Sequence, residues 1–322
     1  MQLLKLNTII SRFDKFEDFA NNFQLGKKDL VITNKFLFEP YMQDLGLDCN
    51  FIFQENYGKG EPTDIMINNM LIDISNLNFD RIVAIGGGTV IDIAKLLVLK
   101  DLKNSVLAFE RNIPLIKEKQ LIVIPTTCGT GSEVTNITIA ELTTIQTKMG
   151  LADDSLTPDY AILIPEFLKS LPFNFYVASG IDALIHAAES YLSPKANNYT
   201  QMYSIEAIEI ILRTFNNIAE KGEEYRFENF EEMLIASNYA GIAFGNAGVG
   251  AVHALSYPLG GNYHVAHGEA NYQFFTTVMK IYQEKNPEGN IQKLNTYLSK
   301  FLNTEINEVY NDLDKLLNKL LI

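Results

Sequence analysis

The fold is decided by the stretch Arg81-Ile82-Val83-Ala84-Ile85-Gly86-Gly87-Gly88-Thr89-Val90-Ile91-Asp92-Ile93-Ala94-Lys95. Its apolar first part is typical of a strand buried on both faces, and its glycines predict a tight turn into a helix. Backbone N–H groups in such a turn can approach an anion, and the start of the helix adds positive potential. The stretch therefore predicts a strand, a phosphate-binding turn and a helix. The alternative is a glycine turn that serves only close packing.

Similar apolar runs lie on either side of this stretch, at Leu30–Thr33 and Leu121–Ile124. Their alternation with helical spacing is typical of a doubly wound α/β domain with a parallel sheet. Beyond about Pro165 the β-branched runs vanish and helical spacing dominates. We therefore expect an α/β domain over residues 1–165 and an all-α domain over residues 166–322. The chain ends inside an amphipathic run, so we expect the second domain to lack its C-terminal end.

Composition narrows the class of protein. Hydrophobic residues make up 47% of the 322 residues and charged residues 20%, which excludes a disordered or collagen-like chain. The net charge of −13 argues against a nucleic-acid partner, because phosphates are repelled. The two cysteines, Cys49 and Cys128, suggest a reducing compartment, and Cys128 is expected to be a small apolar filler. We expect a cytoplasmic protein with no membrane partner.

A second loop, Pro125-Thr126-Thr127-Cys128-Gly129-Thr130-Gly131-Ser132-Glu133, follows the next expected strand. It gathers hydroxyls and glycines at the same end of the sheet as the first loop. Open α/β sheets bind ligands at the carboxyl ends of their strands, so both loops are expected to face one crevice. A polar loop without a ligand is the alternative.

The histidines predict a metal site. The chain has four, and all lie between His186 and His267. Asp182 and His186 stand four residues apart in a helical segment, which places a carboxylate and an imidazole on one helical face. His253, His264 and His267 follow in glycine-rich surroundings. A carboxylate with up to three imidazoles suits Fe²⁺ or Zn²⁺ with an open position, although spacing alone leaves a structural role for each histidine as the alternative.

Three motifs together resemble the iron-containing alcohol dehydrogenase family. They are Gly-Gly-Gly-Thr-x-x-Asp-x-Ala-Lys, Pro-Thr-Thr-x-Gly-Thr-Gly-Ser-Glu and Asp-Ala-Leu-x-His-Ala-x-Glu, followed by the glycine-flanked His253 and by His267-Gly268. The resemblance covers most of the chain in order and spacing. It implies a dehydroquinate synthase-like architecture, a metal between the two domains and reversible hydride transfer between NAD(H) and a small primary alcohol or aldehyde.

Site residues follow from the resemblance by position. The implied metal ligands are Asp182, His186, His253 and His267, with Fe²⁺ as the expected ion and Zn²⁺ as the alternative. The implied cofactor residues are Asn34, Gly86, Gly87, Gly88, Thr89, Thr126, Thr127, Thr130 and Lys148. A catalytic or substrate-facing role is expected for Tyr257 and His264.

Two positions depart from the family pattern. Asn34 stands where many members carry an aspartate that binds the adenosine ribose, so the charge that repels NADP(H) is missing and NADP(H) stays open. Tyr257 stands where many members carry a second histidine, so a tyrosine hydroxyl would have to relay the proton.

The stretch Gly241–Pro258 is similar to members that act on 4-hydroxybutyrate and succinic semialdehyde, which makes this the expected substrate pair. A broad butanol or lactaldehyde dehydrogenase is one alternative. A dehydroquinate-synthase-like lyase and a non-catalytic dinucleotide-binding protein are the others. We also expect a homo-oligomer, with a dimer as the first choice.

Overall fold

The computed structural model describes residues 2–256 and 267–321, and these form two compact units. The sheet unit comprises Asn7–Thr127 and Ser132–Ser170. The helical unit comprises Met1–Leu6, Cys128–Gly131 and Leu171–Ile322. The segment Cys128–Gly131 therefore belongs to the helical unit although both of its neighbours in sequence belong to the sheet unit.

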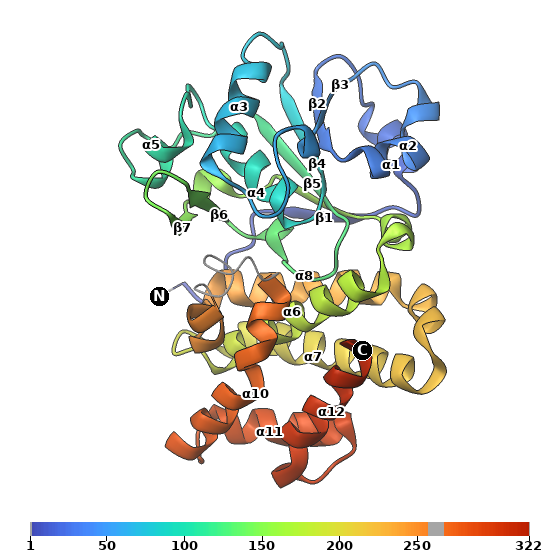
Figure 1. Cartoon of the computed structure of the whole chain (residues 1–322), viewed down its shortest axis with the longest axis vertical. Helices are drawn as coiled ribbons and strands as arrows, with labels where there is room; N and C mark the ends of the chain where they lie inside the picture. Colours follow the sequence, from blue (N-terminus) through green and yellow to red (C-terminus); the bar gives the residue numbers. More distant parts are fainter. Residues whose placement is uncertain (1, 257–266, 322) are drawn as a thin grey trace. The chain divides into compact units, whose positions relative to one another are not determined.

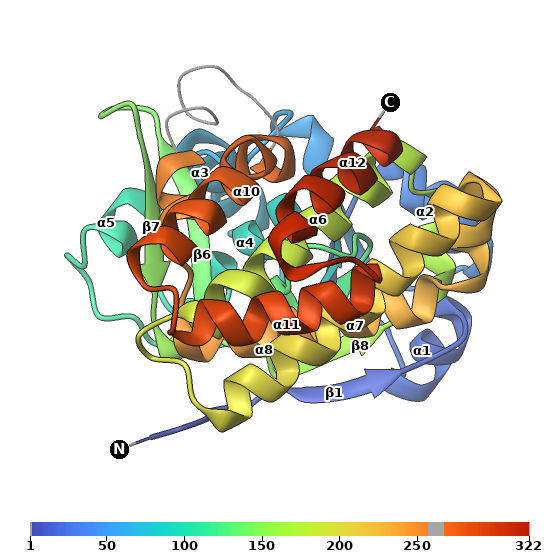
Figure 2. The ribbon, with the colours of Figure 1, turned by 90° about the horizontal axis from the view of Figure 1, so that it is seen from below.

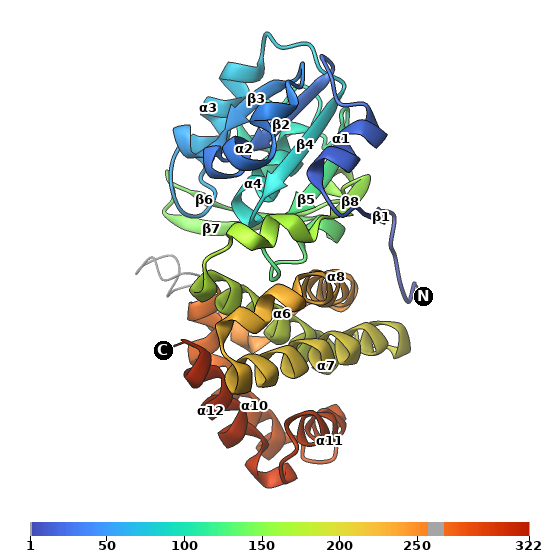
Figure 3. The same cartoon turned by 90° about the vertical axis from the view of Figure 1, so that its right-hand side faces the viewer.

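The sheet unit is built on a six-stranded parallel sheet with the order β1-β8-β5-β4-β2-β3 (Figure 3). Its strands are β1 (Ile9–Arg12), β2 (Asp29–Thr33), β3 (Asn50–Phe53), β4 (Arg81–Gly86), β5 (Gln120–Pro125) and β8 (Tyr160–Leu163). A separate antiparallel hairpin joins β6 (Ile137–Leu142) to β7 (Thr147–Ala152). The expected parallel α/β architecture is confirmed.

Helices cover both faces of the sheet, which is why its central strands are apolar throughout (Figure 1). Alternate residues of β4 divide between the faces: Ile82 and Ala84 pack on one side, Val83 and Ile85 on the other. The helices of this unit are α1 (Phe16–Phe23), α2 (Lys35–Tyr41), α3 (Asp64–Ile74), α4 (Gly88–Leu97) and α5 (Ser105–Phe109).

The strand order reverses direction between β2 and β4. From β2 the chain moves outward to the edge strand β3, then returns through α3 to β4 on the other side of β2. In open α/β sheets such a switch point, at the carboxyl ends of the strands, is where ligands bind. The glycine turn after β4 and Asn34 after β2 both stand at this end of neighbouring strands.

The helical unit contains the long helices expected after residue 165. They are α6 (Phe173–Leu192), α7 (Asn198–Lys221), α8 (Phe230–Ala247), α10 (His267–Lys285), α11 (Asn290–Leu302) and α12 (Val309–Leu321), and residues 251–256 are also helical. Figure 2 shows α10, α11 and α12 lying against α6 and α7. Every residue of α6 from Gly180 to Tyr191 is buried, so this helix forms the core of the unit.

Short 3₁₀ helices connect these elements. They are η1 (Gln43–Leu45), η2 (Gln54–Asn56), η3 (Ser132–Val134), η4 (Asp154–Leu156), η5 (Pro165–Ser170), η6 (Glu223–Glu228) and η7 (Ile306–Glu308). Within the described ranges, no helix has both the length and the apolar character needed to cross a membrane.

Candidate functional site

A buried cluster of metal-ligand side chains lies in the helical unit. Helix α6 places Asp182 and His186 one turn apart, and the helical residues 251–256 bring His253 to them. One ligand atom from each of the three side chains lies within 4.8 Å of the other two. The residues are only 3%, 6% and 3% exposed, respectively. A buried carboxylate with two imidazoles is a donor set that suits Fe²⁺ or Zn²⁺.

Glu189 fixes the orientation of His253. The Glu189 carboxylate lies 2.6 Å from His253 Nδ1 and accepts a hydrogen bond of 2.6 Å from the Val252 backbone N–H. The other ring nitrogen, Nε2, lies 3.8 Å from Asp182 Oδ1. A carboxylate that holds one imidazole nitrogen and directs the other toward a ligand position is a common support for metal-binding histidines.

The pKa of His253 depends on the two carboxylates beside it, Asp182 and Glu189. Burial by itself lowers the pKa of His253, but the hydrogen bonds and negative charges of Asp182 and Glu189 outweigh it and raise the pKa to about 9. For Glu189, burial by itself raises the pKa, but the hydrogen bond and charge of His253 outweigh it, so the pKa lies below its usual value. The two carboxylates therefore stabilise positive charge at this position, and a metal ion can supply that charge.

Ring stacking and one backbone carbonyl hold His186. Its ring stacks on Phe244 at a centroid distance of 4.3 Å and on His253 at 4.4 Å. Its Nδ1 lies 3.3 Å from the Gly129 carbonyl oxygen. A Cβ on Gly129 would come within 2.6 Å of the Ser179 carbonyl oxygen, so only glycine lets this loop approach α6 so closely.

The glycines of the second loop thus serve packing in the helical unit. Gly131 has a φ of +55°, and a Cβ there would lie 2.4 Å from Gly241 Cα of α8. Cys128 is fully buried, and burial raises its pKa to about 12, in keeping with an unreactive filler. Thr126 and Thr127 belong to the sheet unit and Thr130 to the helical unit. Their cofactor contacts stay a prediction.

Helix α10 is anchored to the same cluster. Asn271, fully buried on this helix, donates a hydrogen bond of 2.8 Å to Asp182 Oδ1. A Cβ on Gly268 would lie 2.5 Å from the Ala178 carbonyl oxygen and 3.6 Å from Asp182 Cβ. The backbone next to His267, the first residue of α10, therefore packs directly on the face of α6 that carries Asp182. The side chain of His267 lies outside the described atoms.

Tyr257 and His264 lie outside the described residues. The relay expected of Tyr257 and the substrate contact expected of His264 therefore stay predictions.

In the sheet unit, the glycine turn opens α4 without a side-chain cap. Gly87 is the N-cap residue and, having no side chain, supplies no capping hydrogen bond to the first turn of the helix. A Cβ on Gly86 would lie 2.6 Å from Val90 Cγ2, so this glycine is required by packing. A Cβ on Gly87 would lie 3.4 Å from Thr127 Cγ2, an ordinary contact. Packing therefore does not explain Gly87, and an uncapped helix start fits a pyrophosphate.

The remaining cofactor candidates are tied to neighbouring loops. The Thr89 hydroxyl donates a hydrogen bond of 2.9 Å to the Gly60 carbonyl. Lys148, on β7, pairs with Glu61. Asn34 Nδ2 donates a hydrogen bond of 2.9 Å to Glu55.

Sequence reasoning missed three supports of the metal-ligand cluster: Glu189, Asn271 and the Gly129 carbonyl. Glu189 carried a usable signal, because it stands one helical turn after His186 on the same face as Asp182. Asn271 and Gly129 carried none, since their contacts to α6 depend on how distant segments pack.

Comparisons with known proteins agree with this geometry. The family model described as "Iron-containing alcohol dehydrogenase" matches residues 7–165. The model described as "Fe-containing alcohol dehydrogenase family, C-terminal" matches residues 176–322. The 4-hydroxybutyrate dehydrogenase of Clostridium kluyveri is 54% identical over 321 residues, which are 100% of this chain and 86% of that protein.

Solved structures show the same fold. An iron-containing alcohol dehydrogenase is 25% identical with a TM-score of 0.78, and the match covers 99% of each chain. A sulfoacetaldehyde reductase from Bifidobacterium kashiwanohense, solved with NAD⁺, is 21% identical with a TM-score of 0.84 over 99% of this chain and 86% of that one. The expected dehydroquinate synthase-like architecture and the expected oxidoreductase class are confirmed, which sets aside the lyase and non-catalytic alternatives. Because these two family models together match nearly the whole chain, the chain belongs to the iron-containing alcohol dehydrogenase family.

Proposed function

We propose that this chain transfers a hydride reversibly between NAD(H) and the pair 4-hydroxybutyrate and succinic semialdehyde. The observation that carries the proposal is the buried cluster of Asp182, His186 and His253, braced by Glu189, in a member of this family. The substrate pair is favoured by the 54% identity to a 4-hydroxybutyrate dehydrogenase. A broad butanol or lactaldehyde dehydrogenase is the alternative.

The proposed metal ligands are Asp182, His186, His253 and His267, and the proposed ion is Fe²⁺. Three of these side chains form the buried cluster, and the support for His267 is the packing of Gly268 on α6 beside Asp182. When bound, the ion supplies Lewis acidity toward the substrate oxygen. Zn²⁺ suits the same donors and is the alternative ion.

The protein's own side chains orient this site and keep water out of it. Glu189 holds the His253 ring, and the Gly129 carbonyl with the Phe244 ring holds His186. Asn271 holds one oxygen of Asp182. Because Asp182, His186 and His253 are each held by a partner, these three side chains are already oriented before an ion binds. A proton relay through Tyr257 remains part of the proposal.

Most of the proposed cofactor contacts lie at or just after the carboxyl ends of the parallel strands β2, β4 and β5, whereas Lys148 lies on the hairpin strand β7. The uncapped start of α4 supports pyrophosphate binding there. The full proposed set is Asn34, Gly86, Gly87, Gly88, Thr89, Thr126, Thr127, Thr130 and Lys148. On this basis residues 1–165 would bind the dinucleotide, and residues 166–322 the metal and substrate. We further infer a cytoplasmic homodimer, as expected from the sequence.

The test is NADH oxidation by the iron-loaded protein with succinic semialdehyde, butanal and lactaldehyde side by side. We expect kcat/KM to be highest with succinic semialdehyde. A higher kcat/KM with butanal or lactaldehyde would replace the proposed substrate pair. No oxidation with any of the three aldehydes would contradict the proposed reaction.

A further inference from the structure

The negative charge that Asn34 lacks is present beside it in Glu55. Strands β2 and β3 are parallel neighbours paired as far as Thr33 and Phe53, so the residues that follow each strand emerge side by side. Asn34 Nδ2 donates a hydrogen bond of 2.9 Å to one Glu55 carboxylate oxygen. The Lys35 backbone N–H donates one of 2.7 Å to the other. Both oxygens of Glu55 are thereby held at the carboxyl end of β2.

The same contacts fix which way the Asn34 amide points. Gln54 Nε2 donates a hydrogen bond of 3.0 Å to the Gly58 carbonyl, which directs Gln54 Oε1 toward Asn34 at 3.3 Å. Glu55 and Gln54 Oε1 both present acceptors only, so Asn34 has to turn its NH₂ group to them. Asn34 Oδ1 then points away from Glu55 as an acceptor.

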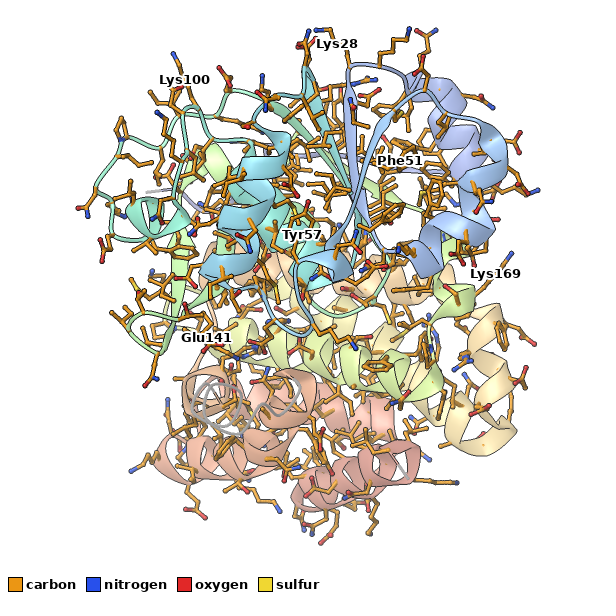
Figure 4. The ribbon with its side chains drawn as sticks, turned by 45° about the horizontal axis from the view of Figure 1, so that its top comes forward. Lys28, Phe51, Tyr57, Lys100, Glu141 and Lys169 are labelled. Atoms are coloured by element: carbon orange, nitrogen blue, oxygen red, sulfur yellow. The ribbon has the colours of Figure 1, made fainter. Side chains whose placement is uncertain are left out.

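Neighbouring contacts make this arrangement rigid. The Phe38 ring of α2 packs on Phe51 and Phe53 of β3 at centroid distances of 4.9 and 5.3 Å. After the strand, the Tyr57 hydroxyl donates a hydrogen bond of 2.6 Å to Asp73 of α3. Figure 4 labels Phe51 and Tyr57, which lie on either side of Glu55 in sequence. The segment that carries Glu55 is therefore tied to a helix on each face of the sheet.

We propose that Glu55, held by Asn34, selects NAD(H) over NADP(H). The proposal rests on the use of a nicotinamide dinucleotide proposed above. The carboxyl end of β2, next to the switch point, is where a doubly wound sheet receives the adenosine ribose. An acceptor oxygen on Asn34 suits a ribose hydroxyl, whereas the Glu55 charge repels a 2′-phosphate, which carries about −1.5 to −2 at neutral pH. Together the two side chains replace a single aspartate.

The ammonium group of Lys35 would favour NADP(H) over NAD(H) if it contacted the 2′-phosphate. Its side chain is exposed, and its Nζ lies 5.8 Å from the centre of the Phe53 ring. If this ammonium paired with a 2′-phosphate, Lys35→Ala would weaken NADPH binding to the otherwise unchanged protein. We expect no such loss.

The test is equilibrium binding of NADH and NADPH, followed by the fluorescence of the nicotinamide, without any turnover. Glu55→Gln should tighten NADPH binding by about tenfold or more and change NADH binding by less than about threefold. Glu39→Gln removes the same charge from an exposed position on α2 and serves as the control. It should leave the ratio of the two dissociation constants unchanged.

The double variant Asn34→Asp/Glu55→Gln exchanges the charged and neutral partners. The amide introduced at position 55 can then donate to the carboxylate introduced at position 34, while the amide oxygen still accepts from the Lys35 N–H. We expect this variant to regain the preference for NADH, which a merely structural role for Glu55 would not produce. An unchanged ratio in Glu55→Gln, or an equal shift in Glu39→Gln, overturns the role of Glu55. If the unmodified protein binds neither nucleotide, the proposed function fails as well.

Discussion

Glu189 shows how much of the metal-ligand cluster depends on a residue that is itself no proposed ligand. It is 1% exposed, and its two carboxylate oxygens hold the His253 ring and the Val252 N–H. Removal of its charge leaves His253 free to change tautomer and ring orientation. Supports of this kind typically contribute about 10- to 100-fold to metal affinity.

We therefore predict that Glu189→Gln weakens Fe²⁺ or Zn²⁺ binding by about 10- to 100-fold. The measurement is metal affinity by competition with a chromogenic chelator. Glu206→Gln, an exposed position on α7, is the matched control and should bind metal as the unmodified protein does. Equal affinity in both variants would remove Glu189 from the support of the site.

His267 belongs to the proposed ligand set through its place at the start of α10. His267→Ala should abolish both tight metal binding and turnover, because the loss of a ligand opens the site to water. Metal content and NADH oxidation are measured on the same preparation. A fully loaded but inactive variant would show that His267 acts on the substrate and not on the metal.

His264 is predicted from the sequence to pair with the carboxylate of succinic semialdehyde. The residues from 245 to 272 contain no Lys or Arg, and a charged imidazole is the natural partner there. His264→Ala should raise KM for succinic semialdehyde by about tenfold, in line with a charge-assisted hydrogen bond, and leave butanal almost unaffected. An equal loss with both aldehydes would return His264 to a structural role.

At the scale of the elements, α4 is tied to the segment that follows the second loop by one buried lysine. Lys95 is fully buried and donates hydrogen bonds to Ser132 Oγ at 2.6 Å, Thr135 Oγ1 at 3.1 Å and the Ile137 carbonyl at 2.6 Å. Burial lowers its pKa to about 8, against the opposing charges of Asp92 and Glu133. The glycine turn and the hairpin are thereby held in one piece.

This lowered pKa makes stability depend on pH in a defined direction. Below pH 8 Lys95 is protonated in both the folded and the unfolded chain; between about pH 8 and 10.5 the unfolded chain binds more protons, so stability rises with pH. The unfolding free energy of the unmodified protein minus that of Lys95→Met should therefore grow by about 2 kcal/mol from pH 7 to 9.5. Urea titrations followed by circular dichroism measure it. A difference that stays flat or falls would contradict the lowered pKa of Lys95.

The sequence predicted those strands and helices that are marked by a pattern of nearby residues. The central strands β2, β4 and β5 are continuous apolar runs, and the helices after residue 165 have clear helical spacing. The strand β1 was missed because it is a short edge strand that is mostly exposed. The hairpin strand β6 was missed although its buried and half-buried residues alternate, which is the period of a strand.

The same distinction holds for the candidate site. The four-residue spacing of Asp182 and His186 is enough to place both on one helical face. The approach of His253, Gly129 and Asn271 comes from tertiary packing, which spacing along the chain does not encode. Likewise, Glu55 lies 21 residues from Asn34 in sequence and reaches it only because β2 and β3 pair in parallel.

For the whole molecule, we propose that Asp182, His186, His253 and His267 hold the metal on which hydride transfer depends. Two observations support this proposal. The family models match residues of both units, and Asp182, His186 and His253 form a buried cluster. The proposal concerns the whole chain, because the proposed metal ligands and all proposed cofactor residues except Thr130 belong to different units. Its test therefore has to use the intact protein with both cofactors.

The most direct measurement is an Fe²⁺ titration of the metal-free protein without oxygen, in which bound iron and NADH oxidation with succinic semialdehyde are read on the same samples. We predict that the rate rises in proportion to bound iron and levels off at a single ion per chain. Asp182→Asn, which keeps the shape of the side chain and removes its charge, should bind no iron tightly and show no turnover. Full turnover by the metal-free protein, or by an Asp182→Asn variant that holds no iron, would show that hydride transfer does not depend on this metal.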